Sequence, residues 1–424
     1  MNLFQYKSEN KRYYTLDNFY KHTFGEKVFK VSLNAGFTCP NIDGTVGRGG
    51  CIYCSPSGSG DFAGNLKDGL VKQFNSVKEV LHKKWPNAKY IGYFQAHTNT
   101  YAPLEILKSY YETILNQPNV VGLAIATRPD AITDECMNYL EALSKKTFLT
   151  IELGLQTIHA ETSNLINRCH DLDTFHRCVI ELRKRNINVV VHIINGLPYE
   201  TKTMMYETVK YLNKLDIQGI KIHMLHILKH TKLGILYKKN PFPVLSKEDY
   251  IQIVCNQLEL LRPEIVIHRI TGDPDPIELI EPSWLTKKFG VLNAIDQELE
   301  KRKTYQGFQL SIEHPLKRLI AIILRESDVV LNQNELYEGF IKTITKKESL
   351  TAINNSYFGK LSLILLMNKN YKEYLPYLNK KGMILILSNE KQDLTEIGYD
   401  ITCYHTEDIN YLYCIQKKQK ASVN

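Results

Sequence analysis

Near the N-terminus the sequence reads Val28-Phe29-Lys30-Val31-Ser32-Leu33, and a loop rich in glycine and proline follows this apolar, strand-like run. The loop holds three cysteines, in Phe37-Thr38-Cys39-Pro40-Asn41-Ile42-Asp43-Gly44 and in Gly49-Gly50-Cys51-Ile52-Tyr53-Cys54. Three thiolates on one loop make a metal site that lacks one ligand. An iron–sulfur cubane held in this way leaves one iron open, which indicates an enzyme rather than an electron carrier. A zinc knuckle, or a disulfide with a spare thiol, remains the alternative, because C-x2-C is also typical of zinc sites.

Length and composition allow two domains with large buried cores. The chain has 424 residues, 43% of them hydrophobic, and 53 Lys and Arg against 45 Asp and Glu give a formal charge of +8. This mild basic excess permits a nucleic-acid partner without demonstrating one. Residues 1–8 have no signal-peptide core and no run of about 18 apolar residues appears, so we expect a cytoplasmic protein without membrane contact. The cysteines outside the loop are scattered singly, which indicates ordinary thiols rather than a disulfide framework.

Short runs rich in β-branched and aromatic residues alternate with stretches of helical pattern, such as 104–115 and 171–185. This order predicts an α/β fold in which βα units surround a parallel sheet, closed or partly closed into a barrel. The six expected strands are 28–33, 90–95, 121–127, 148–153, 187–195 and 219–225.

Polar segments follow the expected strands, at 95–100, 127–130, 152–157 and 195–198. Because the carboxyl ends of parallel strands lie at one end of a barrel, these segments should meet beside the cysteine loop. Polar groups gathered at one end of a barrel indicate a functional site there. This argues against the alternative that the cysteine loop is a zinc knuckle.

The cysteine loop resembles the cluster loop of radical S-adenosylmethionine (SAM) enzymes. Their commonest spacing is C-x3-C-x2-C, whereas here 11 residues separate Cys39 from Cys51 and two separate Cys51 from Cys54. The longer interval is similar to the branch that contains YhcC, MnmL and the catalytic subunit of elongator. The resemblance implies a partial (β/α)6 radical SAM barrel in which Cys39, Cys51 and Cys54 hold a [4Fe–4S] cluster and SAM occupies the fourth iron.

The resemblance continues over residues 10–307, through 93–103 (YFQAHTNTYAP), ELGLQT, 166–170 and the segment around 267–273. Cys169 stands where the branch usually has glycine, a residue that often supplies a positive φ. His192, His223 and His268 are either functional or core histidines satisfied by hydrogen bonds. The residues that the resemblance implies as SAM contacts are Gln95, Thr98, Asn99, Glu152, Gln156, Arg168 and Asn195.

Residues 308–424 form a second expected domain, after a radical SAM domain at 1–307. A helical run at 314–325, E-x-D-V-V-L at 326–331 and apolar runs at 361–367, 382–387 and 411–415 predict a small α/β domain. Their order is similar to MnmM-type SAM-dependent methyltransferases. The segment 331–336 has no glycine, and none follows until Gly339, so we expect a degenerate, Rossmann-like domain without catalysis. An unrelated α/β appendage is the alternative.

The implied chemistry is reductive cleavage of SAM to a 5′-deoxyadenosyl radical, with an electron from an external reductant such as flavodoxin or ferredoxin. The resemblance to MnmL implies a tRNA substrate whose wobble carboxymethylaminomethyl-uridine becomes aminomethyl-uridine. One alternative is the same chemistry on a small molecule or peptide, and another is a non-catalytic tRNA-binding scaffold with a structural metal. The sequence assigns no catalytic acid or base.

Overall fold

The computed structural model describes residues 11–58, 63–313, 330–332, 349–350, 361–367, 371–388, 394, 399–404 and 411–417. The described residues belong to two compact units, one within Tyr6–Phe308 and one within Gln309–Asn424. We describe each unit by itself. In the described part of the chain, no helix combines the length and the apolar character needed to cross a membrane.

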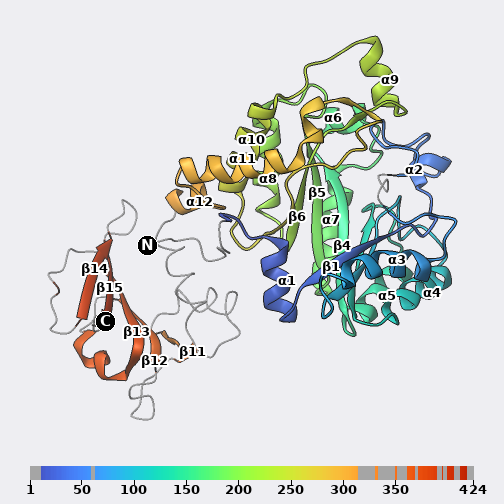
Figure 1. Cartoon of the computed structure of the whole chain (residues 1–424). Coiled ribbons are helices and arrows are strands. Elements are labelled where there is room, and N and C mark those ends of the chain that lie inside the picture. Colours follow the sequence, from blue (N-terminus) through green and yellow to red (C-terminus); the bar gives the residue numbers. More distant parts are fainter. Residues whose placement is uncertain are drawn as a thin grey trace. The chain divides into compact units, whose positions relative to one another are not determined.

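The first unit is built on a curled parallel sheet of seven strands, which forms a half-barrel (Figure 1). The strands follow the order β1-β2-β3-β4-β5-β6-β8. Their bounds are β1 Val28–Leu33, β2 Lys89–Phe94, β3 Val120–Thr127, β4 Phe148–Gln156, β5 Asn188–Asn195, β6 Gly219–Met224 and β8 Val266–Arg269. The α/β class and the barrel type are therefore confirmed. The prediction of six strands was one too few, because β8 is short and half polar.

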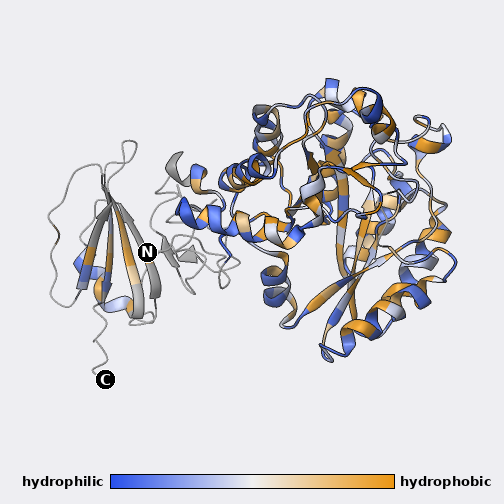
Figure 2. Ribbon diagram, turned by 45° about the horizontal axis from the view of Figure 1, so that its top comes forward, coloured by the Kyte–Doolittle hydropathy of each residue, from blue (hydrophilic) through white to orange (hydrophobic). Residues whose placement is uncertain are grey.

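Helices connect the strands, and many of them contribute apolar residues to the core on the outer face of the sheet. The helices are α1 Leu16–Phe24, α2 Pro40–Asp43, α3 Leu70–His82, α4 Leu104–Leu115, α5 Asp134–Ser144, α6 Ala160–Leu165, α7 Leu172–Lys184, α8 Lys202–Leu212, α9 Lys232–Lys239, α10 Lys247–Leu260 and α11 Lys288–Lys301. A further helix, α12 Phe308–Glu313, begins at the last residue of this unit. A small ribbon pairs β7 Ile227–Leu228 with β9 Leu279–Glu281, and the turn η1 Ser283–Thr286 follows. Figure 2 shows largely apolar strands between helices whose outer surfaces are hydrophilic.

The two faces of the sheet differ because side chains alternate along each strand. Val31, Leu33, Ile151 and Leu153 belong to the large core between sheet and helices. The alternate residues, such as Lys30 and Glu152, point to the inner, concave face. Part of the inner face is closed by a small apolar cluster that α1 helps to form. Its buried members are Tyr20, Val28, Ile91, Tyr93, Ala124 and Ala126.

The second unit contains a six-stranded sheet of order β11-β10-β12-β13-β15-β14. The bounds are β10 Val330–Asn332, β11 Ser349–Leu350, β12 Leu361–Met367, β13 Leu378–Ser388, β14 Tyr399–Tyr404 and β15 Tyr411–Lys417, with η4 Tyr371–Tyr377 before β13. The first four strands in this order are parallel, and β15 runs antiparallel to both of its neighbours. β10, which comes first along the chain, thus lies inside the sheet and not at its edge, as in doubly wound folds.

The features that bear on a methyltransferase-like function lie outside the described residues. These are the helical run 314–325, the E-x-D segment before Val330, and the turn from residue 333 through Gly339. The degenerate methyltransferase domain and its boundary at 307 therefore stay predictions.

Candidate functional site

The cysteine loop begins at the carboxyl end of β1. Cys39 stands at the N-cap position of α2, with Pro40 as the first helical residue. Gly44, Gly49 and Gly50 have φ of 99°, 74° and 74°, so the turns between the cysteines use a conformation that favours glycine. The amide of Ile52 donates to the carbonyl of Ile166 at 3.0 Å, which holds the second part of the loop against the segment after α6.

The thiols of the loop lie in a positively charged surrounding. Cys39, Cys51 and Cys54 are all half-buried. A hydrogen bond from Cys54 lowers the pKa of Cys51 to about 6, against the effect of burial, and the charge of Arg128 adds to the shift. The Nδ2 of Asn41 donates to Cys51 Sγ at 3.6 Å. Since the thiolate is the form that binds metal, this environment favours a metal ligand.

The donor set therefore fits an iron–sulfur cluster by its chemistry. No group of three His, Cys, Asp or Glu side chains within the described ranges is assembled to hold a single metal ion. The eight cysteines whose side chains the structure describes form no disulfide with one another. Cys169 adopts a φ of 62° and so keeps the turn for which the branch uses glycine.

Two predicted SAM contacts present unpartnered acceptors beside this loop. The Nδ2 of buried Asn99 donates to the carbonyls of Phe94 (3.2 Å) and Ala126 (2.9 Å), while its Oδ1 has no hydrogen-bond partner among the described residues. Gln156, the last residue of β4, has a φ of 62°. Its buried Oε1 likewise lacks a partner in the described part of the chain. Such oxygens suit a ligand that carries N–H donors.

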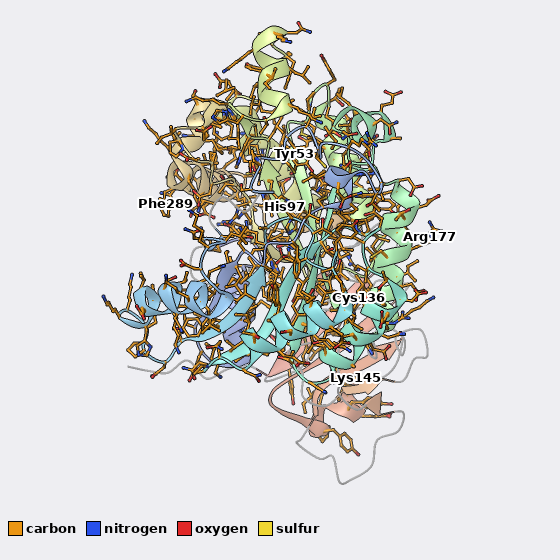
Figure 3. All side chains as sticks on the ribbon, turned by 90° about the vertical axis from the view of Figure 1, so that its right-hand side faces the viewer. Tyr53, His97, Cys136, Lys145, Arg177 and Phe289 are labelled. Atoms are coloured by element: carbon orange, nitrogen blue, oxygen red, sulfur yellow. The ribbon has the colours of Figure 1, made fainter. Side chains whose placement is uncertain are left out.

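Backbone bonds tie two further predicted residues to the loop. The amide of Gln95 donates to the carbonyl of Leu33 at 3.2 Å, and the amide of buried Thr98 donates to the carbonyl of Thr38 at 3.2 Å. These two bonds hold the segment after β2 against the end of β1 and the start of the cysteine loop. Figure 3 shows Tyr53 and His97 toward the same end of the unit, with Lys145 toward the other end.

Arg168 and Asn195 are engaged within the protein. The buried guanidinium of Arg168 donates to the backbone carbonyls of Leu155, Thr157 (2.6 Å) and His170 (2.9 and 3.1 Å). Asn195 makes a reciprocal amide pair with Gln257, with both bonds at 2.8 Å. Arg168 thus fixes the segment after β4, and Asn195 joins β5 to α10. Their direct contact with SAM stays a prediction.

Glu152 lies on the inner face, at the centre of a group of charged and polar side chains that we term the inner-face cluster. Glu152 Oε1 accepts from Lys30 Nζ (2.5 Å), and Oε2 accepts from Lys221 Nζ (2.5 Å) and from His192 Nε2 (2.8 Å). Lys221 Nζ also donates to the Tyr93 hydroxyl at 2.8 Å. The cluster consists of Lys30, Tyr93, Glu152, His192, Lys221 and His268.

Burial and neighbouring charges set the protonation states in this cluster. Burial by itself would raise the pKa of Glu152, but the charges of Lys221 and Lys30 hold it well below its ordinary range. Burial lowers the pKa of Lys221 to about 7, and Lys30 adds to the shift while Glu152 opposes it. Burial and the charge of Lys221 lower the pKa of His192 to about 4. At neutral pH Glu152 is therefore a carboxylate and His192 is neutral.

The sequence did not decide whether His192, His223 and His268 are functional or core histidines, and the structure gives them different surroundings. His192 donates to Glu152, and the Nδ1 of His268 accepts from Lys30 Nζ at 3.3 Å. The buried Nε2 of His223 has no hydrogen-bond partner among the described residues. Lys30 and Lys221 were not among the residues predicted from the sequence. Their signal is a lone lysine within a largely apolar strand, in VFKVSL and in GIKIHM.

Comparison with known families finds two matches. The model described as Radical SAM superfamily matches residues 43–212, and the one described as Radical_SAM C-terminal domain matches residues 217–301. Together they cover the part of the cysteine loop that holds Cys51 and Cys54 and nearly all of the unit from β2 to α11, whereas β1 and Cys39 precede the matched residues.

Several proteins resemble the chain. The uncharacterised protein YtqA of Bacillus subtilis is 53% identical over 307 residues, which are 72% of this chain and 95% of YtqA. YhcC of Escherichia coli is 33% identical over 66% of this chain and 89% of YhcC. A tRNA uridine(34) acetyltransferase of Methanocaldococcus infernus is 23% identical over 36% of this chain and 29% of its own length. Among solved structures, archaeal Elp3 from the same organism has a TM-score of 0.50, at 16% identity, over 66% of this chain and 64% of Elp3, which shows a shared fold.

Proposed function

The chain belongs to the radical SAM superfamily, and we propose that it modifies the wobble uridine of tRNA with a [4Fe–4S] cluster held by Cys39, Cys51 and Cys54. The reaction is the conversion of carboxymethylaminomethyl-uridine to aminomethyl-uridine. The observation that carries the proposal is the loop of three half-buried thiols at the carboxyl end of β1, with the pKa of Cys51 lowered to about 6.

When bound and reduced, the cluster with SAM supplies a 5′-deoxyadenosyl radical that abstracts hydrogen from a substrate carbon. The protein's own residues bind and orient the reactants. Asn99 Oδ1 and Gln156 Oε1 are unpartnered acceptors within the described residues, and they suit the amino group of SAM. Arg128 places a positive charge beside the thiols, and Arg168 fixes the loop after β4. The half-buried position of the thiols is compatible with electron delivery by flavodoxin or ferredoxin.

Two observations support a tRNA substrate. Part of the chain is similar to a protein named as a tRNA uridine(34) acetyltransferase, a name that specifies the wobble position. The formal charge of +8 suits a polyanionic partner, because phosphate contacts contribute much of the affinity for nucleic acids.

Gln156→Ala should weaken SAM binding about 3- to 10-fold and leave the iron content and the free energy of unfolding unchanged. The reason is that the Oε1 of Gln156 has no partner within the described residues, so the substitution breaks a contact with the ligand and none within the protein. Equilibrium binding of SAM to the reconstituted protein measures the effect.

Asn195→Ala is the matched control. It leaves the buried amide of Gln257 without its reciprocal partner, so it should lower the free energy of unfolding by about 1–3 kcal/mol. If Gln156→Ala destabilises the protein as much as Asn195→Ala does and leaves SAM affinity intact, Gln156 is a structural residue.

The tRNA assignment predicts a change in wobble nucleosides when the gene is deleted. Nucleoside mass spectrometry of total tRNA should show carboxymethylaminomethyl-uridine accumulating and aminomethyl-uridine disappearing. Wild-type protein should restore the pattern and Cys51→Ala should not. Unchanged wobble nucleosides in the deletion strain would reject tRNA and direct the search to a small molecule or peptide.

A further inference from the structure

Arg269 is a cation on the inner face that has no anionic partner among the residues that the structure describes. It is the last residue of β8, where an irregularity in the pairing with β6 sets Lys221 opposite Arg269 instead of His268. The side chain is half-buried. Among the described residues it forms no ion pair and no hydrogen bond. In contrast, Lys30 and Lys221, which lie on the same face, both form ion pairs with Glu152.

The groups around Arg269 explain why it has no partner within the protein. Its charge lowers the pKa values of Lys221 and His223, whose largest shifts come from burial, so the guanidinium lies close to both. Glu152 is the carboxylate of this region, and both of its oxygens already accept from Lys30, Lys221 and His192. The titratable groups that face this region are Tyr20 of α1, Lys30 of β1, Tyr93 of β2, Glu152 of β4, His192 of β5, Lys221 and His223 of β6, and His268 of β8.

The region around Arg269 is only partly buried. The apolar cluster that includes Tyr20 and Val28 closes part of the inner face, yet Lys30 and His192 keep 13% and 19% of their side-chain surface exposed. Above the inner-face cluster, the Gln156 side chain lies over Gly154, a neighbour of Glu152 on the same strand. The cysteine loop lies at the carboxyl end of the strands, so a group bound here lies below the site of SAM.

We propose that Arg269 and His223 bind a carboxylate of the substrate at the inner face of the half-barrel. This inference rests on the function proposed above, in which the wobble uridine carries a carboxymethyl group. A guanidinium is always charged and presents paired donors that match a carboxylate. The buried, unpartnered Nε2 of His223 supplies a further polar contact beside it, as judged within the described residues. The bound carboxylate would then neutralise the positive charge of Arg269, which no protein carboxylate among the described residues neutralises.

The cations beside the cysteine loop are other residues. Cys39 and Cys51 raise the pKa of Arg128, against the effect of burial. Cys51 also acts to raise the pKa of Arg168, which burial lowers. Arg269 instead acts to lower the pKa values of Tyr93, Lys221 and His223. It is not among the groups that shift the pKa of Cys51 in the described part of the chain. On this proposal Arg269 serves the substrate, and the cations beside the cysteine loop serve the cofactor.

The test uses the full chain, reconstituted anaerobically and bound to SAM, without a reductant. Calorimetric titration compares N-methylglycine, which reproduces the carboxymethylamino group, with its amide, in which an uncharged carboxamide replaces the carboxylate. Wild-type protein should bind the acid at least about tenfold more tightly, because a charge-assisted contact is lost in the amide. Arg269→Gln should abolish this preference, Arg269→Lys should retain part of it, and Arg177→Gln, at an exposed arginine of α7 (Figure 3), should leave it unchanged.

Arg269→Gln should not lower the free energy of unfolding, because no partner is lost. Equal binding of acid and amide to wild-type protein, or an unchanged preference in Arg269→Gln, would overturn the carboxylate site. Loss of SAM binding in Arg269→Gln would also overturn it, by assigning the arginine to the cofactor. If the preference depends on Arg269 but modified tRNA is not turned over, the carboxylate site stands and the tRNA assignment fails.

Discussion

Cys39→Ala, Cys51→Ala and Cys54→Ala should each yield a protein that keeps little iron after anaerobic reconstitution and releases no 5′-deoxyadenosine from SAM. Each substitution removes one of the three thiols that we propose as cluster ligands, and a cluster iron would then be left without its protein ligand. For Cys51 the loss also removes a thiol whose pKa is lowered, chiefly by a hydrogen bond from Cys54. Iron analysis and chromatography of the nucleoside products measure both effects.

Cys169→Gly is the matched control for these variants. Cys169 is exposed, and its thiol, which donates to Asn167 Oδ1 at 3.3 Å, is close to the space above Gly47. Its φ of 62° suits glycine, so the substitution should leave the backbone unstrained. The variant should keep its iron and its SAM cleavage. If it loses both while Cys39→Ala keeps them, the ligand assignment is wrong.

Glu152→Gln should lower the free energy of unfolding by about 3–5 kcal/mol, the largest effect that we expect from any single substitution on the inner face. The carboxylate is fully buried, and its partners Lys30 and Lys221 have only 13% and 8% of their side chains exposed. Removing the anion leaves these cations together without compensation in a region shielded from water. Denaturant unfolding of the apoprotein measures the loss without interference from the cofactor.

Glu105→Gln provides the comparison at the surface. Glu105 pairs with Lys108 at 2.8 Å, but 82% of its side chain is exposed, so the substitution should change stability by no more than about 1 kcal/mol. If Glu152→Gln unfolds no more easily than Glu105→Gln, the ion pairs of the inner-face cluster are not as described.

The strands of the half-barrel were predictable because each is a short, nearly continuous apolar run. The first expected strand has the bounds of β1, the second is shifted by one residue from β2, and the third begins one residue after the start of β3. The cysteine loop and the polar strand ends were also visible, since parallel strands must bring them to one edge. The seventh strand was missed, because two of its four residues are His268 and Arg269. The predicted end of the fourth strand at 153 fell short of Gln156, whose positive φ lies at an irregularity in the pairing.

The inner-face cluster could not be predicted from sequence patterns. A lysine in a strand is usually read as exposed, and only the curvature of the sheet brings Lys30 of β1 to Glu152 of β4 and Lys221 of β6. The resemblance placed Glu152 among the SAM contacts, whereas the structure surrounds it with protein cations. Arg269 could not be predicted as a binding residue either. Whether an arginine has an ion-pair partner depends on residues from other strands, and the local sequence does not show this.

The most direct measurement is the product of SAM cleavage by the wild-type chain. After anaerobic reconstitution with iron and sulfide, the protein should bind about four irons and release 5′-deoxyadenosine and methionine when it is reduced in the presence of SAM. Release should increase when tRNA that carries carboxymethylaminomethyl-uridine is added. Stoichiometric zinc in every preparation, with no deoxyadenosine formed under reduction, would contradict the account.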